Sequence, residues 1–164
     1  MQDVDLAIKE MAATLKSLMV KKNIENPLMI GIHSGGLWVA EKLHAEMGLQ
    51  KQLGEIDISF YRDDFTRIGV NPQVKPSNIP MSVEGENIIL VDDVLYTGRT
   101  IRAALNEIFD YGRPDSVTLA VLVDRGEREL PMQADVIGLQ LDLSPQKQVK
   151  LTGPTPLALE IINT

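Results

Sequence analysis

The sequence predicts an α/β fold, a single domain with a central, mostly parallel sheet flanked by helices. Continuous apolar runs of strand length, at 27–32, 87–91 and 116–123, alternate with segments of helical periodicity. Continuous runs are typical of parallel strands that are buried on both faces. The 164 residues, 44% of them apolar, contain no repeat or linker, so we expect one domain over residues 1–164.

The N-terminal elements follow from their apolar spacing. Apolar side chains, Leu6 among them, recur every three or four residues and predict an amphipathic helix from about Asp5 to Lys22. The run 27–32 is predicted as a strand, and Leu37 to Met47 as the helix after it. Residues 56–61 alternate apolar and polar side chains, which favours a strand with one solvated face.

The remaining elements begin with a long irregular segment. Residues 62–86 contain three prolines and little periodicity, which indicates a flexible lid or binding loop, with a short hairpin within it as the alternative. A strand is predicted at 87–91, a loop at 92–98 and a helix at 99–111. The apolar run 116–123 is predicted as the next strand.

Composition excludes several kinds of function. The chain has no cysteine, so it has no disulfide, thiolate metal site or cysteine nucleophile, and a metal would be held by oxygens or by His33 or His44. Sixteen cations against 23 carboxylates give a net charge of −7, which argues against bulk electrostatic binding of nucleic acid. The apolar runs are shorter than the roughly 20 residues that span a bilayer. With no basic, apolar leader, we expect a cytoplasmic protein without a membrane partner.

In parallel sheets ligands bind at the carboxyl ends of strands, so site residues are expected directly after Ile32, Val91 and Val123. The second strand end carries a pair of carboxylates followed by a loop that enters a helix. Its sequence is Asp92-Asp93-Val94-Leu95-Tyr96-Thr97-Gly98-Arg99-Thr100.

This string has the chemistry of a phosphoribosyl site. The amides at a helix N-terminus, together with the Thr97 and Thr100 hydroxyls, can cradle a phosphate, and Gly98 lets the backbone come close. The carboxylates, which repel phosphate, can accept hydrogen bonds from sugar hydroxyls. An alternative is that Asp93 and Thr97 only cap the helix. Capping does not explain why two carboxylates end a buried strand.

The first strand end carries His33-Ser34-Gly35-Gly36, where small residues before a helix allow amides to face an anion. It is not a P-loop, because Leu37-Trp38 stand where Lys and Ser or Thr are needed. His33 can also be read as a plain polar loop residue. In the long loop, the cations Arg62, Arg67 and Lys75 could reach a ligand under a closing lid, or could simply be solvated charges.

Residues 88–100 resemble the 13-residue signature of the type I phosphoribosyltransferases. The strings 61–64, 111–114 and 122–131 narrow the resemblance to the PyrR family of pyrimidine-operon regulators and uracil phosphoribosyltransferases. The resemblance extends from about Gly31 to Gly138. It implies the type I fold, with a small hood formed by about 124–150 and part of the N-terminus.

The resemblance also implies a reaction, in which uracil and 5-phosphoribosyl diphosphate give UMP and diphosphate with Mg²⁺. Asp92 and Asp93 would then be catalytic, holding the ribose hydroxyls and the metal that the substrate carries, while 94–100 bind the 5′-phosphate. Residues 33–36 would bind diphosphate, and Arg62 and Lys75 would act from the flexible loop.

For the base, the resemblance implies a role for Arg125 in the hood and for the backbone near Val136 and Ile137. It also implies a homodimer or a higher homo-oligomer.

One departure from the family keeps three functions open. Gly35 stands where the family usually has arginine, which predicts weaker binding of diphosphate. The chain could be a working enzyme, an RNA-binding regulator that senses UMP, or a nucleotide-binding protein with weak or no catalysis. The negative charge, with only one Trp, three Tyr and three Phe, argues against RNA binding.

Overall fold

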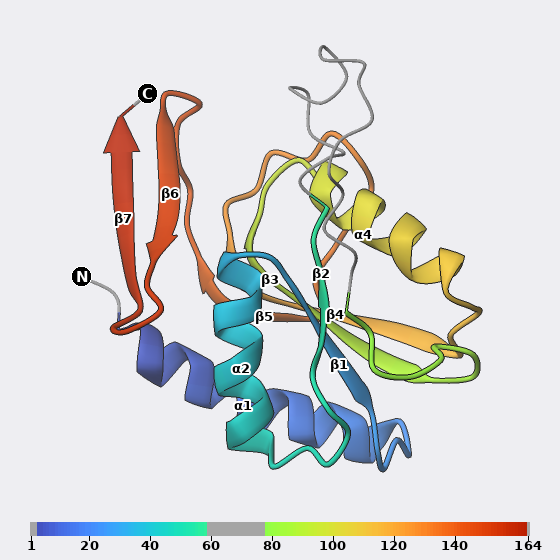
Figure 1. The fold of residues 1–164 in the computed structure, drawn as a ribbon. Coiled ribbons are helices and arrows are strands. Elements are labelled where there is room, and N and C mark those ends of the chain that lie inside the picture. Colours follow the sequence, from blue (N-terminus) through green and yellow to red (C-terminus); the bar gives the residue numbers. More distant parts are fainter. Residues whose placement is uncertain (1–2, 59–77, 164) are drawn as a thin grey trace.

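A computed structural model of the chain describes residues 3–58 and 78–163 (Figure 1). Helices and strands alternate through the first part of the chain, and strands follow one another toward its end. The elements are α1 (Val4–Lys21), β1 (Leu28–Ile32), α2 (Gly35–Met47), β2 (Gly54–Ile56), β3 (Asn87–Leu95), α4 (Arg99–Asp110), β4 (Ser116–Asp124), β5 (Val136–Gln140), β6 (Lys147–Thr152) and β7 (Ala158–Asn163). No helix in these two ranges is long and apolar enough to cross a membrane.

Five strands form one sheet in the order β2-β1-β3-β4-β5, and every neighbouring pair is parallel. This confirms the predicted parallel sheet. Side chains of α1 and α2 share one apolar cluster with one face of the sheet, and α4 covers the opposite face (Figure 1). The carboxyl ends of the strands therefore meet at one edge, where the turns into α2 and α4 begin.

Helix α1 confirms the predicted helix to within one residue at each end. Asp3 caps it, since its carboxylate accepts a hydrogen bond from the Leu6 amide at 3.0 Å. Leu6 itself contradicts the prediction, because it is 52% exposed while Ile8 and Leu15 are buried. The buried face of α1 includes Val4 and Ala7, which pack in the apolar cluster shared with the sheet. Leu6 lies outside this face.

The strands confirm the continuous apolar runs but not all their limits. All five residues of β1 are buried. Strand β3 continues to Leu95, so residues 92–95 belong to a strand and not to the predicted loop. The strand is longer because β4 extends to Asp124 and pairs with β3 as far as Leu95. Strand β2 is Gly54–Ile56 and pairs with the last residues of β1, so it begins before the predicted 56–61, whose residues 59–61 lie outside the described residues.

The C-terminal part divides differently from the predicted hood of 124–150. Residues 136–140 form β5, the edge strand of the main sheet, because they pair in parallel with β4. Strands β6 and β7 form a separate antiparallel pair, which stands beside the sheet in Figure 1. Leu151 and Leu157 anchor this pair in the apolar cluster under α2. The part that stands apart from the main sheet is therefore residues 147–163.

Candidate functional site

The two carboxylates lie in the last part of β3. Asp92 is buried and 4% exposed, whereas Asp93 is half-buried. Asp92 Oδ1 accepts a hydrogen bond from the Asp93 amide, and Asp93 Oδ1 accepts one from the Val94 amide, both at 2.8 Å. Asp93 thus bonds to the strand that carries it and does not cap α4. Because a carboxylate can accept about four hydrogen bonds, Asp93 can still accept from a ligand hydroxyl.

The turn from β1 to α2 packs directly against these carboxylates. A Cβ atom on Gly35 would lie 2.2 Å from Asp93 Oδ2, and one on Gly36 would lie 2.8 Å from the Val91 carbonyl oxygen. Neither position can carry a side chain unless the acidic strand end moves. The Asp93 carboxylate thus occupies the space that an arginine or any other side chain at position 35 would need.

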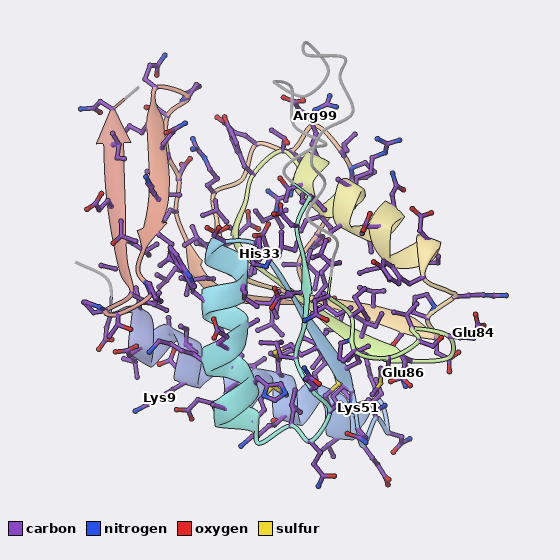
Figure 2. The ribbon with its side chains drawn as sticks, in the orientation of Figure 1. Lys9, His33, Lys51, Glu84, Glu86 and Arg99 are labelled. Atoms are coloured by element: carbon purple, nitrogen blue, oxygen red, sulfur yellow. The ribbon has the colours of Figure 1, made fainter. Side chains whose placement is uncertain are left out.

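The first residues of this turn are held from β2. The His33 amide donates to the Ile56 carbonyl at 2.9 Å, and its Nε2 lies 2.9 Å from Glu55 Oε1. Ser34 stands at the N-cap of α2 without a side-chain capping bond. Figure 2 shows His33 where α2 begins.

The loop from β3 to α4 offers amides to the same edge. Gly98 is the N-cap of α4 and has φ +96°, a left-handed conformation that favours glycine. Thr97 Oγ1 accepts from the Arg99 amide at 3.2 Å, so the capping alternative holds for Thr97 in part. Within the described residues, the amides of Tyr96, Thr97 and Gly98 have no acceptor. A helix that begins in this way can bind an anion.

The third strand end, after β4, is a cluster of charged side chains. Arg128 Nη2 donates to Asp124 Oδ2 at 2.7 Å, and the Gly126 amide donates to Asp124 Oδ1 at 2.9 Å. Burial acts to raise the pKa of Asp124, but the hydrogen bonds from Arg128 and Gly126 and the charge of Arg128 outweigh it and hold this pKa below 3.8. Asp124 is therefore ionised wherever the protein is near neutral pH.

Arg125 connects this cluster to the β3–α4 loop and to the β6–β7 side. It is 5% exposed, and its guanidinium lies 3.9 Å from the centre of the Tyr96 ring. Its Nη atoms donate to the carbonyls of Lys147 at 2.9 Å and Ser144 at 3.2 Å. The buried Nε has no partner among the described residues.

A polar pocket of about 450 Å³ opens at the ends of β4 and β5. Its lining includes Arg125, Arg128 and Gln140 but neither Val136 nor Ile137. Those two lie earlier in β5, where they pair with β4 and where their side chains pack in the two apolar clusters. Because their side chains are part of the core, only the backbone of Val136 and Ile137 is left to contact a base, and the predicted backbone role stays a prediction.

A larger hollow of about 560 Å³, mainly apolar, lies between the C-terminal ends of α1 and α2. It is far from the strand ends that carry the polar groups. The side chains of Lys51 and Glu86 pair at 2.5 Å just before β2 and β3 begin, so they too lie at the amino ends of the strands (Figure 2).

Arg62 and Lys75, like Arg67, lie outside the described residues, as does most of the predicted lid. For a metal, the described residues contain no cluster of three or more His, Cys, Asp or Glu. Two adjacent carboxylates fit Mg²⁺, which prefers oxygen ligands and keeps waters or substrate oxygens in its coordination shell.

Sequence reasoning missed Glu55 and Arg128, which hold the two turns from outside. Arg128 contacts a loop some 30 residues earlier in the chain, and Glu55 lies 22 residues after His33. The only available signal was topological, namely that these segments follow neighbouring strands.

Comparison with known proteins places this geometry among phosphoribosyltransferases. The phosphoribosyl transferase domain family matches residues 2–155. The chain is 58% identical over 161 residues to the bifunctional protein PyrR of Nitrosococcus oceani, covering 97% of this chain and 91% of that protein. It is 56% identical to the bifunctional protein PyrR of Pseudomonas aeruginosa, covering 93% and 90%.

Solved structures show the same fold at low identity. A hypoxanthine phosphoribosyltransferase of Trypanosoma cruzi superposes with a TM-score of 0.68 at 23% identity, over 89% of this chain and 79% of that one. A purine phosphoribosyltransferase of Pyrococcus horikoshii gives 0.65 at 24%, over 85% and 83%.

Proposed function

The chain belongs to the phosphoribosyltransferase family and, within it, to the PyrR proteins, and on that premise we propose that it makes UMP and diphosphate from uracil and 5-phosphoribosyl diphosphate. The observation that carries this proposal is the meeting, at one sheet edge, of two carboxylates and two turns whose amides can face anions. One turn precedes α2 and the other precedes α4.

In this proposal each part of the substrate has its own group of residues. The 5′-phosphate binds in the loop 94–100, where the amides of Tyr96, Thr97 and Gly98 have no acceptor in the described protein. The ribose hydroxyls donate to Asp92 and Asp93. The diphosphate lies against His33-Ser34-Gly35-Gly36, whose glycines bring the backbone next to the acidic pair.

The reaction breaks the bond between the anomeric carbon and diphosphate and forms a bond from that carbon to a ring nitrogen of uracil, which loses its proton. Positive charge develops on the ribose as the bond breaks. Asp92 and Asp93, fixed by their bonds to the β3 backbone, stabilise that charge without having to reorient. Mg²⁺, carried by the substrate and by these carboxylates, supplies charge neutralisation of the departing diphosphate.

For the base we propose the neighbourhood of Arg125, because its guanidinium bridges the Tyr96 ring and the carbonyls of 144 and 147. We also propose that Arg62 and Lys75, in the long loop, contact the diphosphate. A lid that closes there would exclude water from the reacting bond.

The decisive experiment is an assay of the purified chain with Mg²⁺ and 5-phosphoribosyl diphosphate, with labelled uracil, hypoxanthine, guanine and adenine in parallel. We expect UMP from uracil and no nucleotide from the three purines. Nucleotide formation from a purine alone would contradict the proposed specificity. Binding of UMP without any turnover would favour a nucleotide sensor.

A second activity is proposed because the relatives carry the name bifunctional. It is regulation of pyrimidine genes through RNA, with UMP as the signal, in a cytoplasmic homodimer or higher homo-oligomer. The net charge of −7 weighs against it unless the oligomer gathers its cations on one face. UMP should tighten a salt-sensitive complex with a pyrimidine-operon leader RNA. Equal affinity for an unrelated RNA would refute this second activity.

A further inference from the structure

The segment after β4, Arg125 to Met132, which we call the strap, is hydrogen-bonded along the β3–α4 loop. The Arg125 amide donates to the Leu95 carbonyl at 3.1 Å. The amides of Glu129 and Leu130 both donate to the Thr97 carbonyl at 2.9 Å. The strap therefore holds the loop from the side of its carbonyl groups.

The side chain of Arg128 contacts Tyr96, the loop residue between Leu95 and Thr97. Its Nη1 donates to the Tyr96 carbonyl at 3.0 Å and to the Gly126 carbonyl at 3.2 Å. Its Nε donates to the Met132 carbonyl at 2.8 Å, and its Nη2 to the Asp124 carboxylate at 2.7 Å. The side chains of Arg128 and Asp124 are 23% and 9% exposed, so these charged hydrogen bonds are largely shielded from water.

These bonds set the orientation of the loop amides. In a planar trans peptide the C=O and the N–H point in opposite directions. The carbonyls of Leu95, Tyr96 and Thr97 all face the strap, and the Gly98 carbonyl accepts from Arg102 inside α4. The amides that follow these carbonyls, at 96, 97 and 98, therefore point away from the strap, and they have no acceptor among residues 3–58 and 78–163.

We propose that Arg128 is a positioning residue for the 5′-phosphate, acting through the loop and not by contact with the ligand. This inference rests on the proposed function. All three guanidinium nitrogens of Arg128 bond within the protein, and four of its five N–H groups are used in this way, so the side chain is committed to the strap and the loop. Without Arg128, the Tyr96 carbonyl loses its partner and the peptide that ends in the Thr97 amide can rotate.

The test compares Arg128→Lys with the wild type and with Arg113→Lys, an arginine-to-lysine control at an exposed position outside the strap. Lysine can keep the ion pair with Asp124, so the fold keeps its charge balance, but one ammonium cannot bond in the plane of a guanidinium to the carbonyls of Tyr96 and Met132 together. A second variant, the pair Arg128→Gln with Asp124→Asn, removes both charges and serves if the first is unstable.

The readout is the affinity for UMP and for uridine, measured by calorimetry, with KM for each substrate and Tm alongside. We expect Arg128→Lys to weaken UMP binding and raise KM for 5-phosphoribosyl diphosphate by about tenfold, which corresponds to roughly 1.4 kcal/mol. In Arg128→Lys, the affinity for uridine and KM for uracil should change by less than about twofold. In the Arg113→Lys control, all of these quantities should stay within the same limit.

Three outcomes overturn the inference. They are unchanged UMP affinity in Arg128→Lys, equal losses for UMP and uridine, and parallel rises of both KM values with a lower Tm, which indicate general damage. A wild type that binds UMP without turnover would refute the proposed enzyme and still leave the UMP-to-uridine comparison to decide the role of Arg128.

Discussion

The β1–α2 turn and the β3–α4 loop follow neighbouring strands at the same sheet edge, but different interactions hold them. The first is held by hydrogen bonds from His33 to β2 and, at Gly35, by close packing, since a Cβ there would collide with the Asp93 carboxylate. The second is positioned by hydrogen bonds, because the strap and Arg128 bind the carbonyls of Leu95, Tyr96 and Thr97.

This difference predicts that the two turns, which we propose bind anions, tolerate different changes. We expect the first turn to be disturbed by an atom added at Gly35, and the second to be disturbed by removal of a hydrogen-bond donor of the strap. Both turns lie next to the same pair of carboxylates, so the effect of a change in either turn can be measured on the same reaction. The following substitutions test it from the largest expected effect to the smallest.

Replacing Asp92 and Asp93 together with Asn removes the charge that both turns surround. We expect kcat to fall by about a thousandfold or more, since stabilisation of transition-state charge is lost. Steady-state assays with uracil measure this, with Tm as the control for folding. A rate near that of the wild type would refute the catalytic role of the pair.

Gly35→Ala tests the turn that is held by packing. The added methyl group must displace the Asp93 carboxylate, and a shift of about 1 Å at a reacting group can lower kcat about a hundredfold. Gly54→Ala is the matched control, because the described atoms nearest to its Cβ would be in the Ile30 side chain at 3.2 Å, the Pro80 ring at 3.6 Å and the Asn78 carbonyl at 3.7 Å, none of them in the acidic pair. Equal losses of kcat in the two variants would mean that contact with Asp93 is not the cause.

Asp124→Asn tests the charge that anchors the strap. The folded-state pKa of Asp124 is lowered, so its ionised form stabilises the protein fully above 3.8 and loses this contribution as pH falls through the folded value. The variant should lose about 2–3 kcal/mol of unfolding free energy near neutral pH. Urea titrations from pH 7 to pH 3 should show the gap between wild type and variant closing, and a constant gap would contradict this assignment.

Glu129→Gln removes a side chain of the strap and leaves its backbone in place. The pair that Glu129 forms with Arg99 at 2.8 Å is exposed on both sides, and such pairs contribute about 1 kcal/mol or less. Because the Glu129 amide holds Thr97 whatever the side chain, UMP affinity should change by less than about twofold. A tenfold loss would show that side-chain charge, and not the backbone, holds this part of the loop.

Much of the fold could be predicted because burial on both faces leaves a direct pattern in the sequence. The runs that became β1, β3 and β4 are continuous because parallel strands in the middle of a sheet meet no water. The limits of β2 and the end of β3 could not be predicted, since they depend on how far the neighbouring strand extends. The place of 136–140 in the main sheet was also hidden, because strand pairing over long separations has no local signal.

The candidate site divides in the same way. Asp92, Asp93 and Thr97 stand out in the sequence because their types and spacing carry the chemistry. Glu55 and Arg128 do not, because their partners are distant along the chain and a charged residue in a loop is usually solvated. Gly35 was visible as a departure from its family, but the reason for it required the position of Asp93.

The sequence by itself determined the class of fold, and it predicted the strand ends of the candidate site and a phosphoribosyl role for 92–100, because these depend on local residue types and periodicity. Only the tertiary structure decided what holds those groups in place. The carboxylate that excludes a side chain at Gly35, and the arginine that orients the amides after Tyr96, act across segments that approach only when the sheet has formed. That approach is set by packing, which no short stretch of the chain contains.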